Sequence, residues 1–70
     1  MHDAQSQGSH LYVLTLFDGQ GQGTLSGTIT PPAGATRFDV LDHLRRQAGS
    51  TYPSLNNGAV VFFLLEPNTL

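Results

Sequence analysis

The stretch Thr36–Gly49, TRFDVLDHLRRQAG, carries the clearest structural signal in this 70-residue chain. Thr36 can cap the N-terminus of a helix, and Asp39 stands at the third helical position, where a carboxylate is favoured. Gly49 can end the helix. Apolar residues recur at helical spacing and predict one buried face. They are Val40, Leu41, Leu44 and Ala48, with Phe38 at the margin.

Two strands are predicted before this helix and one after it. His10–Phe17 is apolar on both faces, as expected of an interior strand. Thr24–Thr30 alternates apolar and hydroxyl residues, so it suits a sheet edge with one buried face. The glycine-rich turn Asp18–Gly23 joins these two strands as a hairpin. Ala59–Leu65, AVVFFLL, is again apolar on both faces, and Pro67 stops it.

The element order β-β-α-β predicts an α+β fold. We expect the helical crossover to place the third strand beside the first and parallel to it. The result would be a three-stranded mixed sheet of order 2-1-3, with the amphipathic helix on one face. We expect a flexible polar tail at residues 1–9 and a single domain at residues 10–70. In the loop Ser50–Gly58, Tyr52 and Pro53 form either an exposed recognition loop or a plug against the core.

Two resemblances to known proteins rest on these segments. The layout GTITPPAGATRFDVLDHLRRQ (Gly27–Gln47) resembles the front half of the β-grasp, or ubiquitin-like, fold. Sulfur carriers and modifiers of that fold end in Gly-Gly, whereas this chain ends in EPNTL, so carrier chemistry is not expected. The segments LYVLTL, GTITPPAGATRFDV and FFLLEPN are similar to short uncharacterised actinobacterial proteins, a resemblance that implies no activity, ligand or site residue.

Composition narrows the function classes. The chain has no cysteine, so we expect neither disulfides nor thiolate metal sites. The longest apolar run has seven residues, and a membrane span needs about 20. No signal-peptide pattern stands at the N-terminus, so the expected location is the cytoplasm. A net charge of -2, with three arginines as the basic residues, is low for a nucleic-acid binder.

Catalysis and metal binding have little support in the sequence. Gly19–Gly23, GQGQG, is followed by a strand pattern and not by the helix N-terminus of a phosphate loop, so it is expected to be a turn. His2, His10 and His43 lack the spacing of a metal site, and no nucleophile elbow surrounds a serine. We therefore expect no enzyme, no cofactor and no metal. A small-molecule enzyme would require a deep polar pocket.

The remaining signal is an apolar surface. One helix covers one face of a three-stranded sheet, yet two of the strands are apolar on both faces. We expect a second copy, another protein, or else the loop Ser50–Gly58 or the tail to cover the open face. If the helix packs on Leu11, Val13 and Phe17, the expected interaction surface is Tyr12, Leu14, Leu16, Val60, Phe62 and Leu64. Phe63 and Val61 are the choice if the helix lies on the other face.

The predicted function is a non-enzymatic association or regulatory module. It is expected to form a homodimer through the apolar sheet face and the edge of the last strand, either by back-to-back sheet packing or by pairing of the third strands across a two-fold axis, or else a complex with another protein. The alternative is a nucleic-acid-binding regulatory protein that assembles Arg37, Arg45 and Arg46 from two subunits. Helix-end electrostatics and an Asp42–Arg46 pair explain the same arginines without a ligand.

Overall fold

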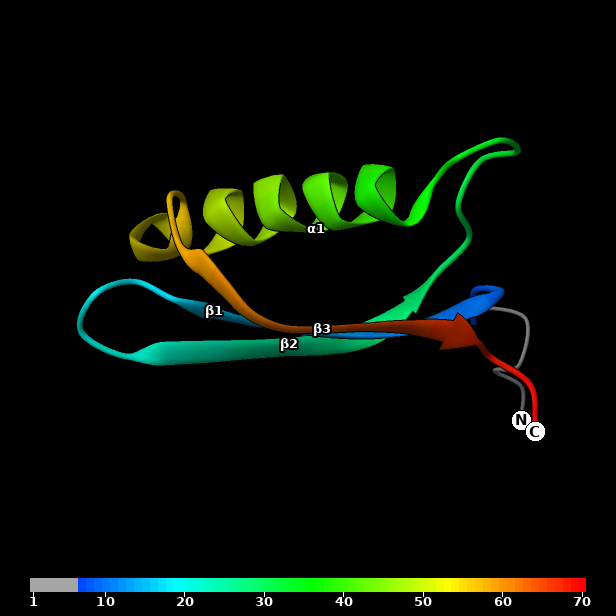
Figure 1. Cartoon of the computed structure of the whole chain (residues 1–70), viewed down its shortest axis with the longest axis horizontal. Helices are drawn as coiled ribbons and strands as arrows, with labels where there is room; N and C mark the ends of the chain where they lie inside the picture. Colours follow the sequence, from blue (N-terminus) through cyan, green and yellow to red (C-terminus); the bar gives the residue numbers. More distant parts are fainter. Residues whose placement is uncertain (1–6) are drawn as a thin grey trace.

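The computed structural model describes residues 7–70. Its elements are β1 (His10–Phe17), β2 (Gln22–Ile29), α1 (Arg37–Thr51), a single 3-10 turn η2 (Pro53–Leu55) and β3 (Ala59–Pro67). The three strands form one sheet in the order β2-β1-β3, and α1 lies across one face of it (Figure 1). The predicted α+β class, element order and strand order are confirmed.

The direction of β3 differs from the prediction. β3 pairs with β1 in antiparallel orientation, so the predicted parallel pair and mixed sheet are wrong. The helical crossover connects β2 to β3, so β3 runs parallel to β2 and not to β1. β1 lies between β2 and β3 and is antiparallel to β2, hence also to β3. The β-grasp expectation, which includes the parallel pair, gains no support.

The N-terminus of α1 forms as predicted. Thr36 Oγ1 accepts a hydrogen bond from the Asp39 N–H at 3.1 Å, and Asp39 Oδ2 accepts one from the Thr36 N–H at 3.1 Å. These reciprocal bonds are a capping box, which satisfies two backbone donors that a helix start otherwise leaves free.

The C-terminus of α1 lies beyond the predicted one. The helix continues through Gly49 to Thr51, so its last turn holds no basic residue and Arg45 and Arg46 are not at its end. Gly49 has no positive φ. A Cβ at this position would lie 2.6 Å from Asn56 Oδ1 and 2.8 Å from Asn56 Cα. Gly49 is therefore required by the close approach of the segment after η2 and not by the helix end.

The core lies between α1 and the sheet. Its buried apolar residues are Leu14, Leu16, Val40, Leu44, Ala48, Leu55 and Leu65. Leu14 and Leu16 of β1 are fully buried. Because side chains alternate along a strand, Leu11, Val13 and Phe17 lie on the opposite face of β1. The helix thus covers the face that carries Leu14 and Leu16.

Three residues of the predicted tail belong to the folded domain. The Gly8 N–H donates to Thr28 Oγ1 at 2.8 Å, and the Ser9 N–H donates to Thr30 Oγ1 at 3.2 Å. Asn68 Nδ2 donates to Gln7 Oε1 at 3.0 Å. Residues 7–9 of the predicted flexible tail are thus hydrogen-bonded to the domain in the structure, and the first six residues of that tail lie outside the described part of the chain.

Candidate protein–protein interface

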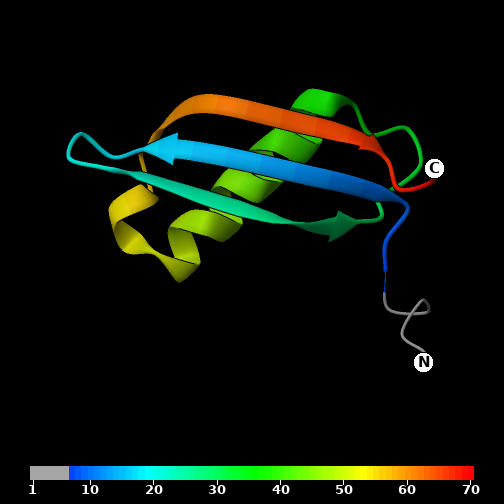
Figure 2. The ribbon, with the colours of Figure 1, turned by 90° about the horizontal axis from the view of Figure 1, so that it is seen from below.

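The face of the sheet opposite α1 has an apolar half and a half lined by hydroxyl side chains. Figure 2 shows this face in front, with the helix behind it. The register places Val13 beside Leu64, so β1 and β3 form an apolar half, which we call the apolar strip: Leu11, Val13, Phe17, Phe62 and Leu64. Thr15, Thr24, Ser26 and Thr28 form a hydroxyl half over β1 and β2. Thr15 Oγ1 and Thr24 Oγ1 are hydrogen-bonded at 2.9 Å.

The exposed apolar side chains gather on β3, where Phe62 lies on the open face and Val60, which pairs with Leu16, lies on the helix side. Three consecutive residues of this outer strand are exposed, with fractions of 39% for Val60, 51% for Val61 and 50% for Phe62. Leu11 and Phe17 of β1 are also exposed. Contiguous apolar surface of roughly 300–600 Å² is the largest that a typical monomer shows and is often functional. The geometry therefore singles out β3 and its neighbour as a candidate interface.

β3 carries a bulge near its start. Thr15 pairs with Phe62 and Leu16 pairs with Val60, so Val61 is an extra residue in β3. A bulge bends and twists a strand locally and ends regular pairing at that point. The regular part of β3 therefore begins after Val61.

Beyond the bulge, the outer edge of β3 exposes backbone groups. The Asn68 N–H donates to Ser9 O at 2.8 Å, so Asn68 faces β1. Backbone groups of successive residues in a strand point to alternate sides. Phe63 and Leu65 therefore direct their N–H and C=O groups away from β1. Arg37 Nη1, on α1, donates to Leu65 O at 3.3 Å, which agrees with a Leu65 C=O that points away from β1.

The three arginines of the alternative prediction each have a bonding partner in the same chain. Arg37 bonds to Leu65 O, and Arg45 Nη2 donates to Gly58 O at 3.0 Å. Arg46 Nη2 lies 3.0 Å from Asp42 Oδ2, which is the predicted i,i+4 pair. Two of the arginines thus link α1 to Gly58, just before β3, and to Leu65 near its end, and the third forms an exposed ion pair with a carboxylate. This arrangement gives no specific support to phosphate binding.

The predicted interaction residues fall on different sides of the sheet. Phe62 and Leu64 lie on the open face. Tyr12, Leu14 and Leu16 face the helix, and this part of the expected surface is wrong. Val60 pairs with Leu16, and Phe63, which pairs with Leu14, packs partly against the core. Leu11, Val13 and Phe17 replace the three helix-facing residues of β1.

The correct face of β1 had a signal in the sequence. β2 has one apolar face, which must point to the core, and Leu25 lies on it. A hairpin that pairs Phe17 with Gln22 places Leu14 opposite Leu25. The pairing across the turn thus decides that Leu14 is covered. The bulge at Val61 has no comparable signal, because the run Ala59–Leu65 is apolar throughout.

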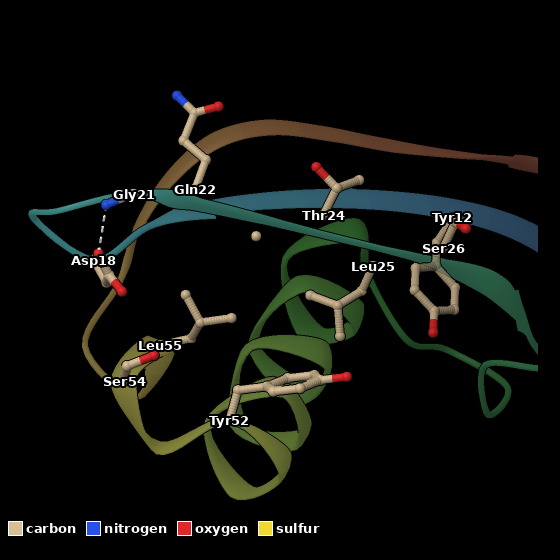
Figure 3. Close-up of a pocket in the computed structure, with 11 residues that line it drawn as sticks. Tyr12, Asp18, Gly21, Gln22, Thr24, Leu25, Ser26, Tyr52, Ser54 and Leu55 are labelled. Carbon is tan, nitrogen blue, oxygen red and sulfur yellow. Dashed lines mark hydrogen bonds between the residues drawn. The ribbon is translucent and has the colours of Figure 1, made fainter.

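A pocket of about 520 Å³ lies between the hairpin turn and η2 (Figure 3). Tyr12, Leu25, Tyr52 and Leu55 line it together with Asp18. Asp18 Oδ1 accepts hydrogen bonds from the N–H groups of Gln20 and Gly21, both at 2.8 Å. These bonds lower the pKa of Asp18 below its ordinary value of 3.8. The carboxylate is thus committed to the turn, and no histidine lines this pocket to act with it.

The other residues considered for chemistry do not form a site. Ser9 Oγ and His10 Nδ1 lie 2.8 Å apart, but they are consecutive and exposed. His43 and Asp39 line a separate groove beside Pro31 and Pro32. Residues 7–70 hold no group of three or more side chains that could bind a metal ion. None of the helices in the same range is long and apolar enough to cross a membrane.

Comparisons with known proteins found no match. No family model matches the chain, and neither a curated protein nor a solved structure is similar to it. The function therefore has to be inferred from the surface and the site geometry.

Proposed function

We propose that this protein is a non-enzymatic association module that forms a homodimer through β3 and the adjoining apolar strip. The observation that carries the proposal is the exposure of Val60, Val61 and Phe62, three consecutive apolar residues on an outer strand. Outer strands of soluble proteins are usually protected by charged residues or proline. In β3 these residues, Glu66 and Pro67, stand only at the end of the strand, and the stretch Ala59–Leu65 contains neither kind.

A second copy suits this surface better than a charged partner. The apolar strip contains no ionisable side chain, so a partner gains little from charge complementarity there. In a two-fold contact the same patch of each copy faces its equivalent in the other copy. The apolar strip carries no charge, so two strips do not repel each other. Full burial of one large apolar side chain contributes about 1.5–3 kcal/mol. A few such residues are enough to matter in a domain whose whole stability is about 5–15 kcal/mol.

Phe62→Asp tests this proposal. We expect light scattering after size exclusion to give the mass of a dimer for the wild type and of a monomer for F62D, because a carboxylate in an apolar contact loses its hydration. Ser26→Asp is the matched control, since Ser26 lies on the hydroxyl half of the same face and its substitution should leave the dimer intact.

The mass of the wild-type protein decides the proposal. A monomer at concentrations of tens of micromolar would overturn self-association. A dimer that F62D leaves intact would show that the contact lies elsewhere on the molecule.

A further inference from the structure

We infer that two copies pair edge to edge through β3, in antiparallel orientation about a two-fold axis beside Leu64, to form one six-stranded sheet. The inference rests on the proposed self-association and specifies its geometry. The strand order of the dimer would be β2-β1-β3 followed by β3-β1-β2 of the partner copy.

The exposed backbone groups define the register. Between the bulge at Val61 and Pro67, which has no N–H, the outward-facing residues are Phe63 and Leu65. In an antiparallel copy that sets Phe63 opposite the partner's Leu65, the N–H of each of these two residues donates to the C=O of the other. The two-fold axis repeats this pair of hydrogen bonds between Leu65 and the partner's Phe63. Leu64 then lies opposite the partner's Leu64. This register pairs all outward donors of the regular part of β3.

The side chains beside the edge are apolar on both sides of the sheet. Phe62 and Leu64 border it on the open face. On the helix side, Phe63 packs partly against the core beside this edge. An added strand must therefore be apolar on both of its own faces.

β3 itself meets this requirement. Ala59–Leu65 is apolar at every position, so either face of this stretch can lie against Phe62 and Leu64 or against Phe63. Glu66, which the register sets opposite the partner's Phe62, is the one charged residue of the paired segment. β2, the other outer strand, alternates and exposes its hydroxyl face. The strand in this chain that matches the β3 edge is thus β3 of a second copy.

The two arginines limit where the pairing can occur. Arg45 donates a hydrogen bond to Gly58 O just before β3, and the bulge follows at Val61. The start of the strand is therefore not available for pairing with a second copy. Arg37 occupies one lone pair of Leu65 O at a long 3.3 Å, and a carbonyl oxygen can accept a second hydrogen bond. The segment Phe62–Glu66 is left for pairing, so of the three exposed residues Val60, Val61 and Phe62 only Phe62 lies within it, and the other two lie beside it.

Packing of the two open faces against each other is the competing arrangement. A strand of eight residues at about 3.3 Å per residue and three strands about 4.8 Å apart make a face of roughly 26 by 14 Å. Only half of this face is apolar. The apolar area is then well below the ~800 Å² per partner of a standard interface, as is the area of an edge contact over Phe62–Glu66, so area alone does not choose between the two arrangements. Edge pairing instead adds backbone hydrogen bonds and joins the two apolar strips into one surface.

Disulfide trapping with Leu64→Cys tests the register, and the absence of native cysteine makes the background clean. Opposed residues of a pair without mutual hydrogen bonds have Cα atoms about 4.5 Å apart, within the range of about 4.4–6.8 Å that a disulfide requires. We expect L64C to cross-link to a covalent dimer under mild oxidation. Val13→Cys is the control, because Val13 is the neighbour of Leu64 on the same face. Edge pairing puts two copies of residue 13 three strand spacings, or about 14 Å, apart.

Each outcome is decisive. Cross-linking of L64C without V13C supports edge pairing about Leu64. Cross-linking of both variants would show face-to-face packing. If light scattering shows a dimer but neither variant cross-links, this register is overturned and self-association still stands. The same conclusion follows if a cross-link forms only when F62C is mixed with L64C. A wild-type monomer would overturn the proposed function itself.

Discussion

Gly49 shows how a single absent side chain allows two elements to meet. The helix passes through this residue, and the segment after η2 comes so close that Asn56 Cα would lie 2.8 Å from a Cβ there. Contacts below 3.0 Å do not occur for real Cβ atoms, and here the neighbour includes backbone, which cannot turn away. The helix-end motif that the sequence indicates is thus replaced by a packing requirement.

Gly49→Ala should destabilise the protein. In an open helix position the same change stabilises by up to about 1 kcal/mol. Here the overpacking against Asn56 should reverse the sign and cost about 1–3 kcal/mol. Urea unfolding followed by circular dichroism measures the shift in midpoint. Gly21→Ala is the control, because a Cβ at Gly21 has no neighbour within 4 Å and should change stability by less than about 0.5 kcal/mol. An unchanged or raised midpoint for G49A would contradict the contact.

At the scale of the elements, the sequence correctly predicts those features that depend on interactions between residues close together in the chain. The capping box of α1 involves residues three apart, and it forms as the letters Thr36 and Asp39 indicate. β1 has the predicted bounds, and the alternation of β2 correctly indicates an outer strand with one buried face. β3 extends to Pro67, where the proline was expected to stop it.

Thr36→Ala should weaken α1 at its start. It removes the hydroxyl that accepts the Asp39 N–H, and the loss of such a cap costs about 0.5–2 kcal/mol. Thermal unfolding should show a lower midpoint for T36A. Thr51→Ala changes a threonine at the other end of the same helix, where no such cap bond exists, and should have little effect. Equal midpoints for T36A and T51A would show that the capping box contributes nothing to stability.

At the scale of the whole molecule, one helix leaves one face of the sheet open (Figure 2). The buried core of residues 7–70 is correspondingly small, and its largest fully buried side chains, Leu14 and Leu16, both come from β1. Chains of this length bury a modest fraction of their surface on folding and are marginal as monomers. Self-association through β3 would supplement this core.

The melting temperature should therefore depend on protein concentration. Assembly of the folded state stabilises it by mass action, so the midpoint of wild-type unfolding should rise as the concentration is increased. F62D, which is expected to be monomeric, should melt at one temperature throughout. Differential scanning calorimetry over a wide concentration range measures both. A wild-type midpoint that does not move would contradict a stabilising dimer.

The candidate interface was predictable only in part. Apolar residues on both faces of β1 and β3 correctly indicate an open apolar surface, and Phe62 and Leu64 lie on it. Tyr12, Leu14 and Leu16 were assigned to the wrong side, because a strand that is apolar on both faces does not indicate which face the helix takes. The hairpin register with the amphipathic β2 decides that question.

The order of the elements, the start of the helix and the outer position of β2 follow from the sequence alone, because capping, turn chemistry and side-chain alternation act between residues close in the chain. The direction of β3 and the helix-covered face of β1 become definite only when the crossover from β2 and the hairpin register are considered together with the strand pairing, and the bulge at Val61 is visible only in the folded chain. These features depend on how distant segments pair and pack, and an apolar run such as Ala59–Leu65 is compatible with either direction and either face. The same ambiguity in the sequence leaves β3 able to pair with a copy of itself.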